Sequence, residues 1–428
     1  MRLLSVQYAG CYKEAFYQLA QGEHEETYYA QKYSVDAVAG LKQYADEVAT
    51  LSYLTNETYD EHLPNGVRAI GAGMRGEVDF KEILRFIKSY NPTHLILRTP
   101  TTEVLKWAVQ HKIPTIATLA DSFQAKGLRN RIKNLQLAHL LNSKSVHWVG
   151  NHGVSASRSL QRIGVNPDKI IPWDWPHVIT PSLFSAKTLR SDEQVDSQPW
   201  NMLFVGHLSE AKGVGDALRA IADLKQKGLT VNLKLAGKGS LEQFQLQAQQ
   251  LGIANQVEFL GLVKNKEVVT LMRSADLVLI PSRHEYPEGF PMTIYEALCS
   301  RTPIIASDHP MFRERLQHLN NAMIFQAGNA NALANCVEDI LQSPHLYHSL
   351  SQASAEAWQR LQIPVQWGDF LNYWLQQSPE SHNWLQEKTL ASGLYNQPQQ
   401  PQPAIDSSPI HADDAPDPSA EHAILPSL

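Results

Sequence analysis

Two glutamates in the second half of the chain stand at a spacing that suits the recognition of hydroxyl groups. In the segment ADLVLIPSRHEYPEGFPMTIYEAL, Glu288 lies in a loop after an expected strand, and Glu296 lies eight residues later on the helix that follows. A carboxylate accepts hydrogen bonds from vicinal hydroxyls, such as those of a ribose or a hexose. Ligands of open α/β sheets bind outside the carboxyl ends of the strands, which is where the loop with Glu288 lies.

The backbone between these glutamates also suits an anionic group. The N–H groups of Gly289, Phe290 and Met292 lie near the N-terminus of the expected helix, where unpaired donors and the helix dipole favour negative charge. A nucleotide, which joins ribose hydroxyls to phosphates, would use both features. Two glutamates on a loop and a helix are more often solvated or capping residues, so the rest of the sequence has to decide between these interpretations.

The elements that position these residues follow from the hydropathy pattern. Short apolar runs bounded by turn residues alternate with polar segments long enough for a helix, which is typical of βα units around a mostly parallel sheet. We therefore expect an α/β protein. In the first half the expected strands are 3–8, 48–53, 94–98, 114–119, 146–150 and 169–173, and in the second half they are 201–205, 232–236, 257–262, 276–281, 303–307 and 322–325.

The length of 428 residues is too great for one ordinary core and suits two domains with a tail. We expect an N-terminal domain at 1–180 and a C-terminal domain at 200–376, joined by a polar linker at 181–199 that has prolines at both ends. The segment 377–428 is expected to be disordered, because it becomes rich in Pro, Gln and acidic residues. A solvated tail is the simpler interpretation, and a docking or autoinhibitory arm is the alternative.

The composition argues against several other classes of protein. No stretch reaches the about 18 apolar residues of a membrane span, and the N-terminus is typical of a first buried strand, so we expect a cytoplasmic protein. The net charge of −6 does not support nucleic-acid binding. Three widely spaced cysteines argue against a disulfide framework, and the seventeen histidines show no metal-ligand spacing, so neither a metal ion nor a cofactor is expected.

The segment with the two glutamates is similar to the donor-site signature of glycosyltransferase family 4, a family of retaining enzymes with the GT-B fold. EGFPMTIYE matches the two spaced glutamates of that signature, and ALCSRTPIIAS follows it. Upstream, FVGHLSEAKGVGDALRAI resembles the first strand and phosphate loop of the family's C-terminal domain, LAGKGSLEQFQ its next loop, and VEFLGLVKNKEVVTLMRSADLVLIPS the elements before the glutamates. The resemblance runs in order over 201–325, and this order is more specific than any single motif.

This resemblance implies two Rossmann-like domains that face each other across a cleft, with the donor held by the C-terminal domain and the last helices packed back on the N-terminal one. It implies a retaining hexosyltransferase that moves a sugar from a UDP- or GDP-sugar to a saccharide or lipid-linked acceptor in polysaccharide or glycolipid synthesis, without a metal ion. Two other classes stay open. They are a nucleotide-sugar epimerase and a degenerate, non-catalytic subunit that binds nucleotide-sugar.

Residue roles carry over from the family by motif position. Glu296 would hold the ribose hydroxyls, and Glu288 would face the transferred sugar, with backbone contacts from Gly289 and Phe290. Lys212 would neutralise the donor diphosphate as the leaving nucleotide gains negative charge.

Several positions depart from the family pattern. Gly206 is followed by His207 where family members commonly have Arg, so phosphate affinity is expected to depend on pH. After the strand ending at Ser307, Asp308 and His309 replace the usual Gly-Gly turn, which removes expected backbone donors.

The N-terminal half matches the family more loosely. In IPTIATLADSF, Ala120 stands where members have a cleft His, and Asp121 is left as the catalytic candidate or, alternatively, as a cap of the following helix. Gly10, after the first strand, would be a remnant of a glycine loop that approaches the donor.

A basic segment follows Asp121 and runs from Lys126 to Lys144 without an acidic residue. As a helix it would combine basic positions with Leu128, Ile132, Leu135 and Leu140, which suits peripheral contact with an anionic membrane face and a lipid-linked acceptor. A solvated basic face is the alternative interpretation.

Overall fold

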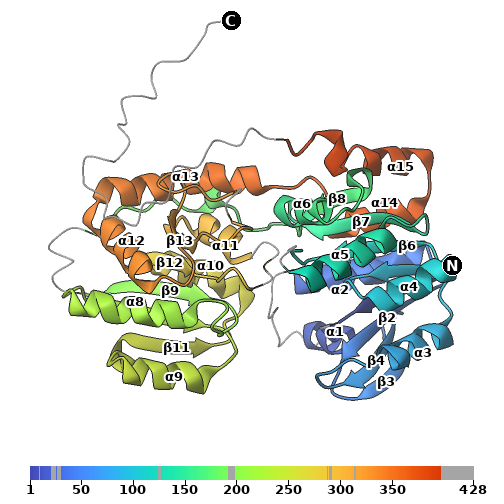
Figure 1. Cartoon of the computed structure of the whole chain (residues 1–428), viewed down its shortest axis with the longest axis horizontal. Helices are drawn as coiled ribbons and strands as arrows, with labels where there is room; N and C mark the ends of the chain where they lie inside the picture. The colour runs from blue at the N-terminus through green and yellow to red at the C-terminus, as the bar shows by residue number, and fades with distance from the viewer. Residues whose placement is uncertain are drawn as a thin grey trace, which may run out of the picture. The chain divides into compact units, whose positions relative to one another are not determined.

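The structure is a computed structural model that describes residues 1–8, 10–20, 26, 30–123, 127–190, 198–286, 288, 292–312 and 315–396. The chain divides into two compact units, each built on one sheet with helices packed against it (Figure 1). Unit 1 contains Met1–Val178, Glu288 and the segment that returns from Gln362, and unit 2 contains Ile179–Tyr286 and Met292–Leu361.

Within the described residues, the sheet of unit 1 has the strand order β3-β4-β2-β1-β5-β6-β7-β8. All neighbouring strands are parallel except β3 and β4, which are antiparallel. The strands are β1 (Arg2–Gln7), β2 (Glu47–Leu54), β3 (Thr58–His62), β4 (Arg68–Met74), β5 (His94–Leu97), β6 (Thr115–Leu119), β7 (Val146–His152) and β8 (Ile170–Trp173). The helices are α1 (Tyr12–Ala20), α2 (Gln31–Gly40), α3 (Phe80–Tyr90), α4 (Thr102–Gln110), α5 (Leu128–Leu141), α6 (Val154–Arg162), α14 (Trp367–Gln376) and α15 (Pro379–Gln386).

Successive residues of the unit 1 strands enter opposite cores. In β1, Leu4 and Val6 belong to one apolar cluster, whereas Leu3 belongs to the other, which also contains Trp367 of α14. A parallel sheet covered by helices on both faces needs strands that are apolar at nearly every position. This requirement explains why continuous apolar runs predicted the central strands.

The hairpin of β3 and β4 was not expected from the sequence. The strand β3, TYDEH, carries charged residues and is nowhere fully buried, and β4, RAIGAGM, contains two glycines. Gly71 is required there, because a Cβ at this position would lie 2.3 Å from Cε1 of Tyr59. Polar edge strands of this kind lack the apolar run on which the prediction depended.

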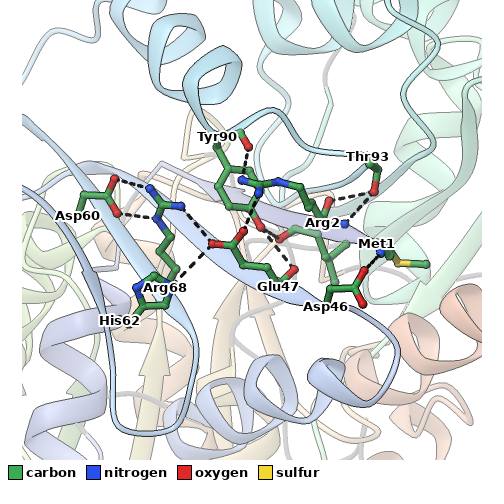
Figure 2. A network of polar contacts seen from close by, with 10 residues as sticks. Met1, Arg2, Asp46, Glu47, Asp60, His62, Arg68, Tyr90 and Thr93 are labelled. Carbon is green, nitrogen blue, oxygen red and sulfur yellow. Dashed lines mark hydrogen bonds and ion pairs between the residues drawn. The ribbon is translucent and has the colours of Figure 1, made fainter.

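A polar network joins the amino ends of β1, β2 and β4 to β3 (Figure 2). Arg68 donates to both carboxylate oxygens of Asp60 at 2.7 and 2.9 Å and to Glu47 at 3.1 Å. Arg2 also pairs with Glu47 at 3.1 Å and stacks on the ring of Tyr90 at 4.6 Å. The network therefore fastens the strands at the edge opposite to their carboxyl ends.

The described residues of unit 2 form a wholly parallel sheet with the order β11-β10-β9-β12-β13-β14. Its strands are β9 (Trp200–Val205), β10 (Val231–Ala236), β11 (Val257–Gly261), β12 (Leu277–Ile280), β13 (Ile304–Ser307) and β14 (Met323–Phe325). Its helices are α8 (Val214–Gln226), α9 (Leu241–Gln250), α10 (Asn265–Ser274), α11 (Met292–Ser300), α12 (Ala330–Gln342) and α13 (Pro344–Leu361). Every strand predicted in either half is present within one or two residues, so the α/β class is confirmed.

The prediction of disorder for 377–428 is wrong for the first part of this segment. α15 follows directly, because Ser378 caps it by accepting from the backbone N–H of Ser381, Pro379 occupies the first turn, and Leu385 is buried. These residues belong to unit 1, and the residues from 397 onward lie outside the described part of the chain.

The segment expected to be a linker, 181–199, is partly packed on unit 2. Lys187 donates from its backbone N–H to Ser351 Oγ at 2.7 Å and from Nζ to the carbonyl of Arg273 at 2.9 Å. Residues 191–197 of this segment lie outside the described residues.

Candidate nucleotide-sugar site

The loops after β9 and β10 run side by side beyond the carboxyl ends of their strands. The N–H of Gly206 donates to the carbonyl of Ala236 at 2.9 Å, and the N–H of Leu208 donates to that of Lys238 at 2.7 Å. Gly237 has φ +146°, and a Cβ there would lie 1.8 Å from the carbonyl oxygen of Gly206. Glycine is therefore required at Gly237, and the loops present backbone rather than side chains at this edge.

The loop that carries Lys212 is fastened to the loop after β12. Arg283 donates its backbone N–H to the carbonyl of Ala211 at 2.8 Å, and its guanidinium binds both oxygens of the buried Asp216 at 2.7 and 2.8 Å. The ammonium of Lys212 lies 4.3 Å from the centre of the Tyr286 ring, a cation–π distance. The expected diphosphate lysine is thus held at the carboxyl edge of the sheet, at the start of α8.

Glu296 lies on the buried face of α11 and is only 6% exposed. Its Oε1 accepts from Nδ2 of Asn265, the first residue of α10, at 3.0 Å. Burial raises the pKa of Glu296 to about 7, and the Asn265 hydrogen bond opposes this rise only in part. A buried carboxyl that has one amide donor is costly to ionise, and its ionised form is stabilised if a ligand supplies further donors.

The residues that replace the family's Gly-Gly turn form a polar brace instead. Asp308 accepts from the N–H of Ala327 at 2.9 Å and contacts His284 Nε2 at 2.7 Å. The fully buried His309 accepts at Nδ1 from the N–H of Met311, which leaves Nε2 to donate to the carbonyl of Tyr286 at 3.1 Å. From the sequence, only a loss of backbone donors was expected at these residues, and the brace that they form was not predicted.

A family model described as Glycosyl transferases group 1 matches residues 185–357, the part of the chain that contains all of these loops. This segment is a glycosyl transferases group 1 domain. The suspected relationship to group 1 glycosyltransferases is thereby confirmed.

Curated relatives match over part of this chain. A phosphatidyl-myo-inositol mannosyltransferase of Mycobacterium leprae is 30% identical over 184 residues, which is 42% of this chain and 48% of that protein. A glycogen synthase of Mycobacterium tuberculosis is 26% identical over 170 residues, which is 40% of each chain. The chain thus spans about half or less of the length of these relatives.

Solved structures match over both units. HepE of Anabaena, solved in complex with UDP-glucose, has a TM-score of 0.59 at 15% identity and covers 90% of this chain and 100% of its own. Sucrose-phosphate synthase of Thermosynechococcus elongatus has a TM-score of 0.61 at 15% identity, with 90% and 99% covered. These likenesses concern the fold, and the GT-B class with two Rossmann-like domains is confirmed.

For the other residues that were predicted to contact the donor, the structure gives fewer contacts. Glu288 is buried, at 5% exposure, and is counted with unit 1, whereas Gly289 and Phe290 lie outside the described residues. Met292 is the first residue of α11 and is half-buried, and His207 is exposed after β9. The roles expected for these residues remain predictions.

In unit 1, Asp121 follows β6, and burial raises the pKa of its carboxyl. The alternative that Asp121 caps the next helix is wrong, because the N-cap of α5 is Gly127. Gly10 is exposed after β1 with φ +88°, a conformation that favours glycine. Arg98 follows β5 and donates to Gln7 Oε1 at 2.9 Å. This contact was not predicted, although a single Arg after the apolar run HLIL was the available signal.

The described residues contain no group of three or more His, Cys, Asp or Glu side chains that could hold a metal ion. Among the helices that the structure describes, none is long and apolar enough to cross a membrane.

Proposed function

We propose that this protein is a glycosyltransferase that binds a nucleotide-sugar at the carboxyl edge of the group 1 domain. The observation that carries the proposal is the environment of Glu296, a buried carboxyl with a raised pKa and one amide donor. The two adjacent hydroxyls of a ribose would supply the missing donors. The similarity to a mannosyltransferase, and to HepE, which was solved in complex with UDP-glucose, supports this chemistry.

In this proposal the donor diphosphate lies over the paired loops after β9 and β10, where Gly206, His207 and Lys212 stand. Lys212 neutralises the charge that develops on the leaving nucleotide, so that no metal ion is required. Glu288 faces the transferred sugar, and Asp121 orients the acceptor. The reaction is a retaining transfer to a saccharide or lipid-linked acceptor.

Titration calorimetry with UDP, GDP and ADP and their sugar conjugates, with and without EDTA, tests this function. We expect selective, EDTA-insensitive binding of one nucleotide and transfer of the sugar to an acceptor. Donor binding without turnover would favour a non-catalytic subunit, and release of an isomeric donor without free nucleotide would favour an epimerase. Failure to bind any of these nucleotides would overturn the proposal.

A second part of the proposal concerns the exposed surface of α5 and the location of the acceptor. On α5, Leu128, Ile132 and Leu135 are 75%, 60% and 64% exposed, and the basic side chains between them are exposed as well. The chain has no acidic residue from Ser122 to Pro167. We infer that this helix contacts an anionic membrane face from the cytoplasm, which suits a lipid-linked acceptor in glycolipid or polysaccharide synthesis.

The structure changes the set of residues that was predicted to contact the membrane. Leu140 was counted with the lipid-facing residues, but it is buried in the apolar core of unit 1, whereas Lys126 lies outside the described residues and Lys144 is exposed beyond α5. Cosedimentation with vesicles of phosphatidylglycerol or phosphatidylcholine tests the contact. We expect binding to the anionic vesicles only, and its loss when Leu128, Ile132 and Leu135 become Ser. Equal cosedimentation of that variant would contradict the inference.

A further inference from the structure

Unit 1 contains a recess that the proposed sugar transfer does not use. It has a volume of ≈910 Å³ and lies at the amino ends of β7 and β8, the edge opposite to the carboxyl ends where Gln7 and Asp121 stand. Its lining residues come from the start of these strands and from the end of α14 with the turn into α15. We call this recess the amino-edge groove.

The charge of the groove is mainly positive. Lys144, Lys169, His147 and His382 line it, whereas Asp168 is the acidic residue among the lining residues. Burial lowers the pKa of His147, and its Nδ1 accepts from Trp374 Nε1, so this ring is neutral and the positive charge of the groove belongs to Lys144 and Lys169. An acidic ligand would be attracted to these two lysines.

Lys169 is the most buried of these cations, and burial lowers its pKa to about 8. Its Nζ donates to the carbonyls of Leu141 and Ser143 at 3.1 and 2.8 Å. An ammonium group has three N–H donors, so two carbonyl contacts leave it able to bind an incoming carboxylate.

The floor and the second wall of the groove are aromatic and apolar. Val146, Trp148, Tyr373, Trp374 and Leu385 line it. Trp374 Nε1 donates to Nδ1 of His147 at 3.1 Å, which fixes the ring beside the groove. Aromatic-lined grooves favour proline-rich segments, which are already extended and lose little entropy on binding.

The described chain ends beside this groove. The short helix Leu390–Ser392 packs against Pro167–Lys169, which contributes Asp168 and Lys169 to the groove, and Arg158 donates to the carbonyl of Tyr395 at 2.9 Å. The sequence that follows Asn396 contains seven prolines, no Lys or Arg, and the acidic residues Asp406, Asp413, Asp414, Asp417 and Glu421.

We propose that the amino-edge groove binds the acidic, proline-rich segment 413–421 of the same chain. Asp414 and Asp417 are three residues apart, so they share one face of a polyproline II helix, which has about 3 residues per turn. From Asn396 to Asp413 is 17 residues, and an extended chain spans about 3.3 Å per residue, so the segment reaches every part of the groove. The covalent tether raises its effective concentration to the order of mM. The proposal is independent of the donor site.

A fluorescent synthetic peptide of residues 404–428 tests this proposal by anisotropy, with the full-length chain as the receptor. In one form of the chain, Asp413, Asp414 and Asp417 are changed to Asn and Glu421 is changed to Gln. The peptide is expected to bind this form at least about tenfold more tightly than the unmodified chain, because the chain's own segment no longer competes. High ionic strength should weaken the binding.

Matched charge reversals locate the binding surface. In the neutralised chain, Lys144→Glu with His382→Glu is expected to lower peptide affinity about tenfold, whereas Lys88→Glu, an exposed lysine on α3 outside the groove, should change it less than about twofold. Unchanged melting temperatures would show that these variants fold. Equal peptide affinity for the neutralised and unmodified chains would overturn the intramolecular proposal, as would the absence of binding or a loss with Lys88→Glu as large as with the groove variant.

Discussion

Glu47 and Glu296 are residues of one type in two sheets of similar construction, yet their surroundings differ. Glu47 begins β2 and is held by two guanidinium groups, those of Arg2 and Arg68, each at 3.1 Å (Figure 2). Glu296 is buried on α11, and its carboxylate accepts from the amide of Asn265, a neutral donor. The first carboxylate is neutralised by the protein itself, whereas the second has its pKa raised by burial.

This difference suggests a structural role for Glu47 and a ligand-binding role for Glu296. A carboxylate at the amino edge of a sheet that is paired with guanidinium groups links neighbouring strands, and its charge is already balanced without a ligand. A buried, weakly paired carboxyl near the carboxyl edge costs stability when it ionises, and residues of this kind gather at functional sites. The comparison leads to three predictions, each of which changes one of the two regions.

The largest effect is expected for Glu296→Ala. Loss of the buried acceptor should weaken nucleotide-sugar binding by more than tenfold, roughly 1.4 kcal/mol or more, in titration calorimetry. The matched control is Glu47→Ala, which should leave the affinity unchanged while it loosens the amino edge. An equal loss of affinity in both variants would mean that Glu296 acts through stability alone.

A smaller effect is expected from pH. The pKa of Glu296 rises from 4.5 to about 7 on folding, so the folded chain holds this proton more tightly than the unfolded chain. The contribution of this group to stability therefore falls as pH rises from about 4.5 to about 7. Ligand hydroxyls donate to the ionised form, so donor affinity should rise as pH passes through about 7.

Calorimetric binding curves across this pH range would measure the second effect. Glu296→Gln should remove the part of the pH dependence that belongs to this carboxyl. A pH profile identical to that of the unchanged chain would argue against titration of Glu296.

The smallest effect is expected for Arg68→Met. This change removes a cation from both Glu47 and Asp60, but these groups are partly exposed, so we expect a loss of about 1 kcal/mol in unfolding free energy. Thermal unfolding would measure it. Nucleotide binding by the same variant should stay unchanged. A clear drop in affinity would contradict the proposal that the amino-edge network has a structural role only.

The sequence predicted those parts of the fold that depend on periodic burial. The strands that lie between helices appear as expected, because most of them are short apolar runs covered on both faces, whereas the edge strand β11 has no fully buried residue. The hairpin of β3 and β4 was missed because it lies at the edge, where charged side chains and Gly71 meet the packing requirements. α15 was missed because one buried apolar residue, Leu385, and a capped first turn order a segment that is polar on average.

The candidate site was predicted in part. Motif order located Glu296 and Lys212, since each follows a strand in a recognisable segment. Arg98 and the Asp308–His284 pair were missed, because contacts between loops of different strands leave no local spacing in the sequence. Such contacts depend on strand order, which the sequence alone did not provide.

The return of the chain to unit 1 has a consequence for how the protein is made. Trp367 and Phe370 are completely buried in the same apolar cluster as Leu3, and the backbone of Asp174 bonds to Val365 and Trp367. A ribosome would release the segment for unit 2 before these residues emerge. The core of the N-terminal sheet, although that sheet is synthesised first, therefore stays incomplete on the face that also packs against α1 and α2 until synthesis has passed α14.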